Sequence, residues 1–204
     1  MRNIILSIVF LLFGHTAFTQ VVIPIEKAHH DVKNNPSKVY KQLYWKDVNN
    51  ILNKYEGEWE GTYNNKTFYF KISKQIKVSS PYSTDFSEDL LNVKYIITDN
   101  RTGKVLQDKF KVSTQQLSRG MPEFLTENSY PLNYYADTKE QIGCGDRGLM
   151  LLSYDPKNKL KVHVIPRQVT YIVIEGNPDP CDGVSVDLPF PRTEDKAMTL
   201  TKKK

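Results

Sequence analysis

The spacing of apolar residues along the chain changes at Gly57 from a helical period to strict alternation. Before Gly57, Asn35 is a suitable N-cap and Pro36 occupies a position that the first turn of a helix tolerates. Apolar residues then recur at every third or fourth position: Tyr40, Tyr44, Val48, Ile51 and Tyr55. This spacing predicts one amphipathic helix, or two short ones, over residues 37–55.

The residues after Gly57 predict antiparallel strands. Apolar side chains alternate with polar ones over residues 59–63, 68–78 and 91–97, and Lys74 alone interrupts the apolar face of the second run. Further strand-like runs lie at residues 104–112, 149–154, 160–165, 169–174 and 198–202, with turn-forming Asn, Asp, Pro and Gly between neighbouring runs. Roughly seven or eight short strands without intervening helices predict a barrel or a sandwich.

Two long polar connections interrupt this series, at residues 113–147 and 177–197. Connections of this length are often functional or mobile, although an unconstrained surface excursion fits them equally well. The first connection contains Tyr130, Tyr134 and Tyr135, and tyrosine is enriched at protein interfaces. These three tyrosines are therefore candidates for an interaction surface.

The first residues have the pattern of a secretory signal peptide. Arg2 precedes an apolar run at residues 4–13, and the small residues Ala17 and Thr19 are placed for cleavage before Gln20. The run is too short to cross a bilayer, which takes about 20 apolar residues, and no later segment is long and apolar enough. We predict a signal peptide at 1–19, an N-terminal arm at 20–36 and one domain at 37–204, exported to the periplasm or the exterior.

The composition is that of an ordinary globular protein. Of 204 residues, 39% are hydrophobic and 25% are charged, with 28 Lys and Arg against 23 Asp and Glu. The basic residues are dispersed except for Lys202, Lys203 and Lys204, which argues against nucleic-acid binding. Cys144 and Cys181 form an even pair in an exported chain and are predicted to be disulfide-bonded in an oxidising compartment.

The segment Gly57-Glu58-Trp59, placed between a helical lead-in and the first strand, resembles the opening motif of lipocalins. Residues 45–55, the turn at Tyr154-Asp155 and residues 198–203 are similar to an uncharacterised family of secreted, lipocalin-like (calycin-like) bacterial proteins. The resemblance implies an all-β, up-and-down antiparallel barrel with an N-terminal helix, in which Trp59 plugs one end. It implies no activity. For the cation that lipocalins place over this indole, the candidates are Arg192 and Lys202.

The chain lacks the motifs of common catalytic and metal sites. A Gly-rich phosphate loop, a Gly-x-Ser-x-Gly elbow and a His-Glu-x-x-His sequence are all missing. His29 and His30 are adjacent but have no further ligands nearby, and the alternation around His163 places its side chain in water. We predict a non-catalytic protein with no metal and no cofactor.

The inward-facing aromatic residues leave two functions open. Trp59, Tyr63, Phe68, Phe70 and Tyr95 either line a cavity for a small apolar ligand or fill the barrel interior. A cavity favours an exported binding module for an apolar molecule. A filled interior favours an accessory or inhibitory component of a cell-envelope or secreted protein complex.

Overall fold

The computed structural model describes residues 20–28, 34, 42–80, 83–110, 128–135, 147–167 and 189–203. Over these residues the chain is mostly β-structure, which confirms the all-β prediction. The strands are β1 (Val21–Pro24), β2 (Leu43–Lys46), β3 (Gly57–Tyr63), β4 (Lys66–Ser80), β5 (Ser83–Asp99), β6 (Val105–Asp108), β7 (Ser129–Tyr135), β8 (Arg147–Asp155), β9 (Lys159–Arg167) and β10 (Met198–Lys202). Short 3-10 helices occupy η1 (Ile25–Lys27), η2 (Asn53–Tyr55) and η4 (Glu194–Lys196).

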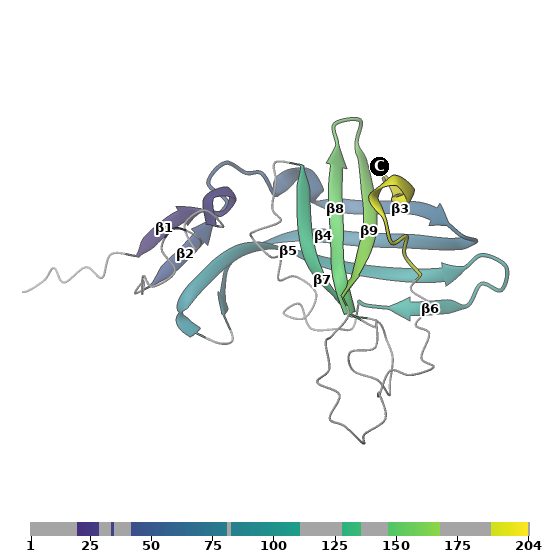
Figure 1. Ribbon diagram of the computed structural model, residues 1–204, viewed down its shortest axis with the longest axis horizontal. Coiled ribbons are helices and arrows are strands. Elements are labelled where there is room, and N and C mark those ends of the chain that lie inside the picture. Colours follow the sequence, from purple (N-terminus) through teal and green to yellow (C-terminus); the bar gives the residue numbers. More distant parts are fainter. Residues whose placement is uncertain are drawn as a thin grey trace, which may run out of the picture.

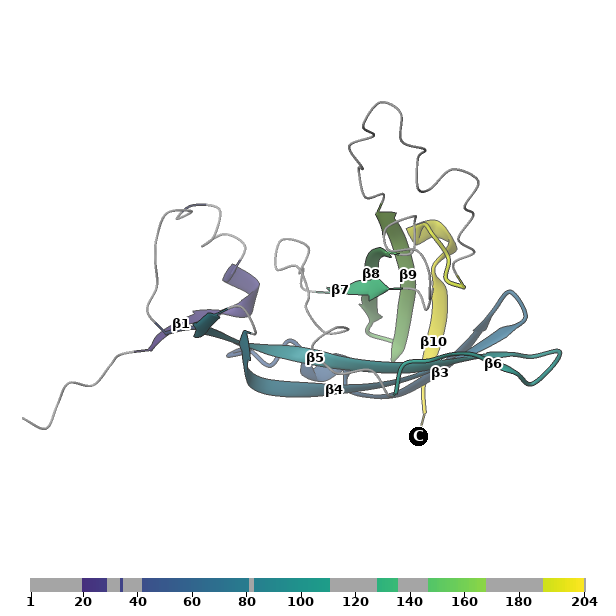
Figure 2. The same cartoon turned by 90° about the horizontal axis from the view of Figure 1, so that it is seen from below.

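The strands form one sheet that contains two antiparallel meanders. The strand order is β1-β2-β5-β4-β3-β10-β9-β8-β7, and β6 pairs with β5. The first meander is β3 to β6 and the second is β7 to β10, and they are joined where β10 pairs with β3 through Thr201↔Glu60 and Lys202↔Trp59. In both views, β8 and β9 run crosswise to β4 and β5, so the sheet folds over on itself (Figures 1 and 2).

The sheet is not closed, so the prediction of an up-and-down barrel is wrong. Closure would require β6 to pair with β7, and no such pairing occurs among the residues that the structure describes. Side chains join the two meanders instead. The Tyr130 hydroxyl accepts a hydrogen bond from the Leu91 amide at 3.0 Å, and Gln107 Nε2 lies 3.4 Å from the Tyr134 hydroxyl.

The core lies between the two meanders and follows the predicted alternation. In the first meander, Phe68 and Phe70 of β4 and the odd-numbered residues from Leu91 to Ile97 of β5 are buried. The second meander contributes residues from each of its four strands: Leu132, Leu152, Val162 and Leu200, among others. Each such side chain stabilises the fold by about 1.5–3 kcal/mol through burial alone.

The predicted helix at 37–55 is also wrong within the described residues 42–55. Leu43–Lys46 is strand β2, which pairs in parallel with both β1 and β5. Only Asn53–Tyr55 is helical, as a single 3-10 turn. The apolar residues have a helical spacing, but such a local pattern favours a helix only weakly. Pairing with two strands that are distant in the sequence overrides it.

The hairpin of β4 and β5 extends well beyond the core. None of residues 74–80 is buried, and this part of the hairpin curves toward β1 and β2 (Figure 1). A β-bulge between Gln75 and Val78 gives Lys77 a positive φ of 52°. This part of the hairpin, together with the segments that contain β1 and β2, is called the edge lobe below. The edge lobe comprises residues 20–28, 42–52, 74–80 and 83–90.

Candidate functional site

The space between the meanders, which the sequence assigned to a possible ligand, is occupied by Phe190. This ring is 2% exposed and comes from a segment between Pro189 and Pro191. Its centroid lies 5.3 to 6.4 Å from the rings of Phe68, Phe70, Tyr95 and Tyr134. The Val164 amide donates a hydrogen bond of 2.8 Å to the Pro191 carbonyl, which holds the backbone of this segment in place.

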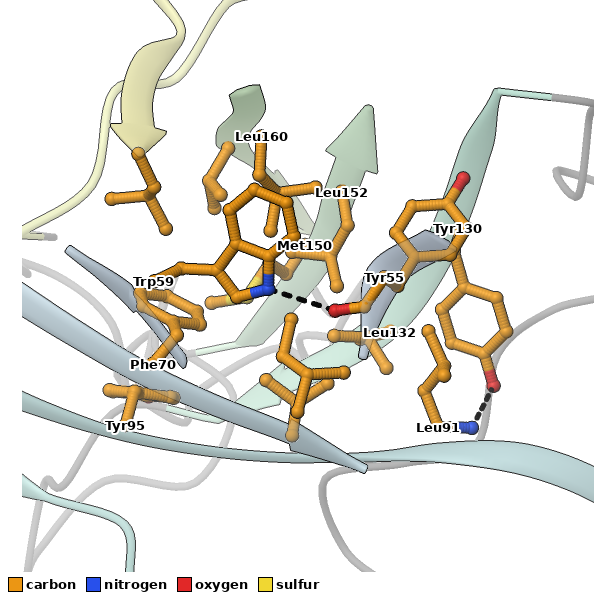
Figure 3. Close-up of a cluster of buried hydrophobic side chains, with 14 of the residues drawn as sticks. Tyr55, Trp59, Phe70, Leu91, Tyr95, Tyr130, Leu132, Met150, Leu152 and Leu160 are labelled. Atoms are coloured by element: carbon orange, nitrogen blue, oxygen red, sulfur yellow. Dashed lines mark hydrogen bonds between the residues drawn. The ribbon is translucent and has the colours of Figure 1, made fainter. Parts of the chain in front are cut away.

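Four of the five predicted ligand-lining residues belong to this packed core. Trp59, Phe68, Phe70 and Tyr95 are fully buried in one cluster, and Tyr63 packs against it half-buried. Figure 3 shows how the aromatic rings of the first meander meet aliphatic side chains of the second. The structure brings these residues together, and they contact one another and Phe190.

Trp59 lies on β3, where β3 pairs with β10 and the two meanders join. Its indole Nε1 donates a hydrogen bond of 2.8 Å to the carbonyl of Tyr55 (Figure 3). Lys202 Nζ lies 5.3 Å from the indole centroid, within the range of a cation–π contact. Gly57 has a φ of +123°, which residues with a side chain rarely adopt.

The tyrosines predicted as an exposed contact surface are mainly structural. Tyr130 and Tyr134 lie on strand β7 instead of in a loop, and both are buried. Alternation explains this, because residues 130, 132 and 134 lie on the same face of the strand and are all buried. The side chain of Tyr135 lies outside the described residues.

A buried carboxylate organises the turn that follows β2. Asp47 Oδ1 accepts a hydrogen bond of 2.7 Å from the Ile51 amide, and Oδ2 accepts one of 3.2 Å from the Leu52 amide. Lys74 Nζ lies 2.7 Å from the same Oδ2, with its side chain only 13% exposed. Lys74 is the residue that interrupts the apolar face of β4 in the sequence, and this ion pair is the reason for the interruption.

A second buried carboxylate connects this turn to the β4–β5 hairpin. Asp89 accepts hydrogen bonds from the Tyr44 hydroxyl at 2.6 Å, the Asp47 amide at 2.9 Å and the Lys77 amide at 2.8 Å. Burial, together with the adjacent Asp89 carboxylate, raises the pKa of Tyr44, so the phenol remains protonated and continues to donate. The residues Tyr44, Asp47, Lys74 and Asp89 are called the anchor network below.

The anchor network fixes the edge lobe and does not have the geometry of an acid–base site. Asp47 accepts two hydrogen bonds and pairs with Lys74, and Asp89 accepts three hydrogen bonds. Their carboxylate oxygens therefore have little remaining capacity to accept a proton from a substrate. Such buried charges are expensive to desolvate, and they are tolerated only when they are paired and hydrogen-bonded. Their effect is to hold β2 and the bulged hairpin in one fixed arrangement.

The edge lobe also contains a pocket of about 460 Å³, which lies open to solvent. Its lining combines opposite charges from Lys77 and Asp85 with the apolar side chains of Leu43 and Phe86. Gln20, Gln42, Ser79 and Ser87 complete it. These residues come from four separate stretches of chain, so no local sequence motif could have indicated the pocket.

The remaining candidate residues have different outcomes. Cys144, Cys181, His29 and His30 lie outside the described residues, so their predicted roles remain predictions. His163 was expected to face water but is only 4% exposed, since η4 packs against β9, and this burial lowers its pKa. Within the described ranges, no three His, Cys, Asp or Glu side chains are grouped as metal ligands.

No helix in the described part of the chain has both the length and the apolar character needed to cross a membrane.

Comparison with models of protein families identifies a family for this chain. The model of a family of unknown function, DUF6705, matches residues 1–175. The chain belongs to this family. The matched DUF6705 region contains β1 to β9 and the anchor network, and it ends before Phe190 and β10. No curated protein and no solved structure matches the chain.

Proposed function

We propose that this protein is an exported, non-catalytic binding module that acts by contacting another protein of the cell envelope or of a secreted complex. The observation that carries the proposal is the position of Phe190, which fills the space that a lipocalin-like carrier would keep for its ligand. The opening motif at Trp59 and the cation of Lys202 over the indole support a lipocalin-like origin for the module. Export is supported by the signal-peptide pattern of residues 1–19.

A filled interior makes binding of an apolar molecule in the core costly. A ligand between the meanders would have to displace the Phe190 ring, and loss of a buried Phe ring costs about 3–5 kcal/mol. Binding at the surface avoids this cost. The surface is therefore the better place to look for a partner.

The edge lobe has the properties expected of a protein-binding surface. The anchor network ties its segments together through buried hydrogen bonds and an ion pair, which reduces the conformational freedom that would be lost on binding. It exposes apolar residues, chiefly Ile76, which is 70% exposed, together with Val21, Val22 and Val48. Charged and polar residues of the pocket lie in the same lobe, and interfaces combine apolar with polar residues.

The test is cross-linking of the protein in its export compartment, followed by mass spectrometry of the cross-linked partners. The wild type is compared with Ile76→Asp, and with Ile165→Asp as a matched control, because Ile165 is 43% exposed on the other meander. We expect one protein partner to be recovered with the wild type and the control and to fall at least tenfold with Ile76→Asp.

Two results would contradict the proposal. Equal recovery of the partner with both Asp variants would show that the edge lobe is not the binding surface. A stoichiometric lipid or pigment in the native wild-type protein, with no protein partner, would instead favour the small-ligand function.

A further inference from the structure

Gln20 lies one residue before the first strand of the sheet. The ladder of β1 begins with Val21, whose amide donates a hydrogen bond of 3.1 Å to the carbonyl of Gln42. Gln20 is therefore held within the edge lobe by its neighbour without being part of the strand ladder itself. The expected signal-peptide cleavage falls on the bond that precedes Gln20, which would make it the first residue of the exported chain.

The side chain of Gln20 has room to change conformation. It lines the open pocket of about 460 Å³ and is only half-buried. Among the described residues, no hydrogen bond or ion pair holds its amide group. The amide can therefore turn back toward the nitrogen of its own residue.

We propose that Gln20 becomes the N-terminus of the exported protein and closes to a pyroglutamate ring; this modification rests on the proposed export. The free α-amine attacks the side-chain Cδ of the same residue and forms a five-membered lactam. The bond from Cδ to Nε2 breaks, and the Nε2 group takes up a proton and leaves as ammonia. The ring closure is intramolecular and needs no oxidant, reductant or co-substrate.

The lactam protects a vulnerable part of the fold. Strand β1 has four residues, and its first two, Val21 and Val22, are exposed. An aminopeptidase that removed Gln20 and the next residues would destroy β1, which is the outer partner of β2. The lactam has no free α-amine for such an enzyme, and it replaces a charged terminus by a neutral group at a pocket that Lys77 also lines.

The test is mass spectrometry of the N-terminal peptide from protein secreted with its own residues 1–19. Free amines are labelled by reductive methylation at harvest, before any heating or acid, so that ring closure during handling is excluded. We expect a peptide that begins at Gln20, has lost one ammonia and carries no label on its α-amine. Pyroglutamyl aminopeptidase should then remove its first residue.

The matched control is Gln20→Asn, which keeps an amide but would need a strained four-membered ring. We expect this variant to carry the label at residue 20 and to retain its full mass. A wild-type peptide that begins at Gln20 with a labelled amine overturns the inference and leaves the proposed function intact. Secreted wild-type protein that begins at another residue also overturns it, and protein that stays inside the cell with residues 1–19 attached refutes export as well.

Discussion

Replacement of Phe190 by alanine tests whether the space between the meanders is filled. The ring is 2% exposed and contacts four other aromatic rings. Truncation of a buried Phe to Ala costs about 3–5 kcal/mol, and well-placed aromatic pairs contribute about 0.5–1.5 kcal/mol each beyond burial. We therefore expect Phe190→Ala to lower the free energy of unfolding by about 4–5 kcal/mol.

The assay is urea denaturation followed by the fluorescence of Trp45 and the buried Trp59. An apolar cavity of this kind stays dry and binds benzene, so benzene at tenfold excess over its Kd should restore about 1.4 kcal/mol to Phe190→Ala. It should leave the wild type unchanged. The exposed control Ile76→Ala should remain within about 0.5 kcal/mol of the wild type.

The total stability of such a domain is only about 5–15 kcal/mol, so Phe190→Leu provides a milder variant if the alanine protein does not fold. We expect it to lose about half as much stability, since less of the ring contact is removed. If Phe190→Ala unfolds at the urea concentration of the wild type, the ring does not fill the core. The argument against an internal ligand then fails.

Three further predictions concern other parts of the structure. Lys74→Met leaves the Asp47 carboxylate buried without its cation and should lower the free energy of unfolding by about 3 kcal/mol, whereas an unchanged urea midpoint would show that the ion pair is not buried. Gly61→Ala places a methyl group against the Thr199 carbonyl of β10 and should cost about 3 kcal/mol in thermal unfolding; a tolerated alanine would contradict the close approach of β3 and β10. Because burial lowers the pKa of His163 below its usual 6.5, the unfolded chain binds more protons there. Urea midpoints should therefore fall as the pH is lowered through 6.5, and His163→Gln should remove that part of the pH dependence.

Local pattern was sufficient to predict most of the strands. The alternation at residues 59–63, 68–72 and 91–97 correctly identified both the strands and their buried faces. The turn at Asp155–Asn158 correctly placed the hairpin of β8 and β9. These features are determined by residues that are close together in the sequence, and a periodic pattern contains that information.

The errors concern features that depend on distant partners. Leu43–Lys46 becomes a strand because β1 and β5 lie on either side of it, and nothing within the segment itself indicates those partners. Barrel closure depended on β6 and β7, which are separated by residues 109–128. The sequences of β6 and β7 do not indicate whether the two strands pair with each other.

The candidate site was only partly indicated by the sequence. Lys74 was visible as a charge on an apolar strand face, but its partner Asp47 lies 27 positions earlier in a turn. Phe190 carried no signal, because a single aromatic residue between two prolines belongs to no periodic pattern. Both residues acquire their roles only when the two meanders meet.

The position of β10 between β3 and β9 has a consequence for the order of events during synthesis. Strand β10 follows the other described strands in the sequence, and among the described residues it is the strand that bridges the two meanders by backbone hydrogen bonds. Until it emerges, β3 and β9 each have an open edge that can pair with another chain. Such long-range pairing is slow to form, so both edges stay open until β10 has been synthesised and has paired with them.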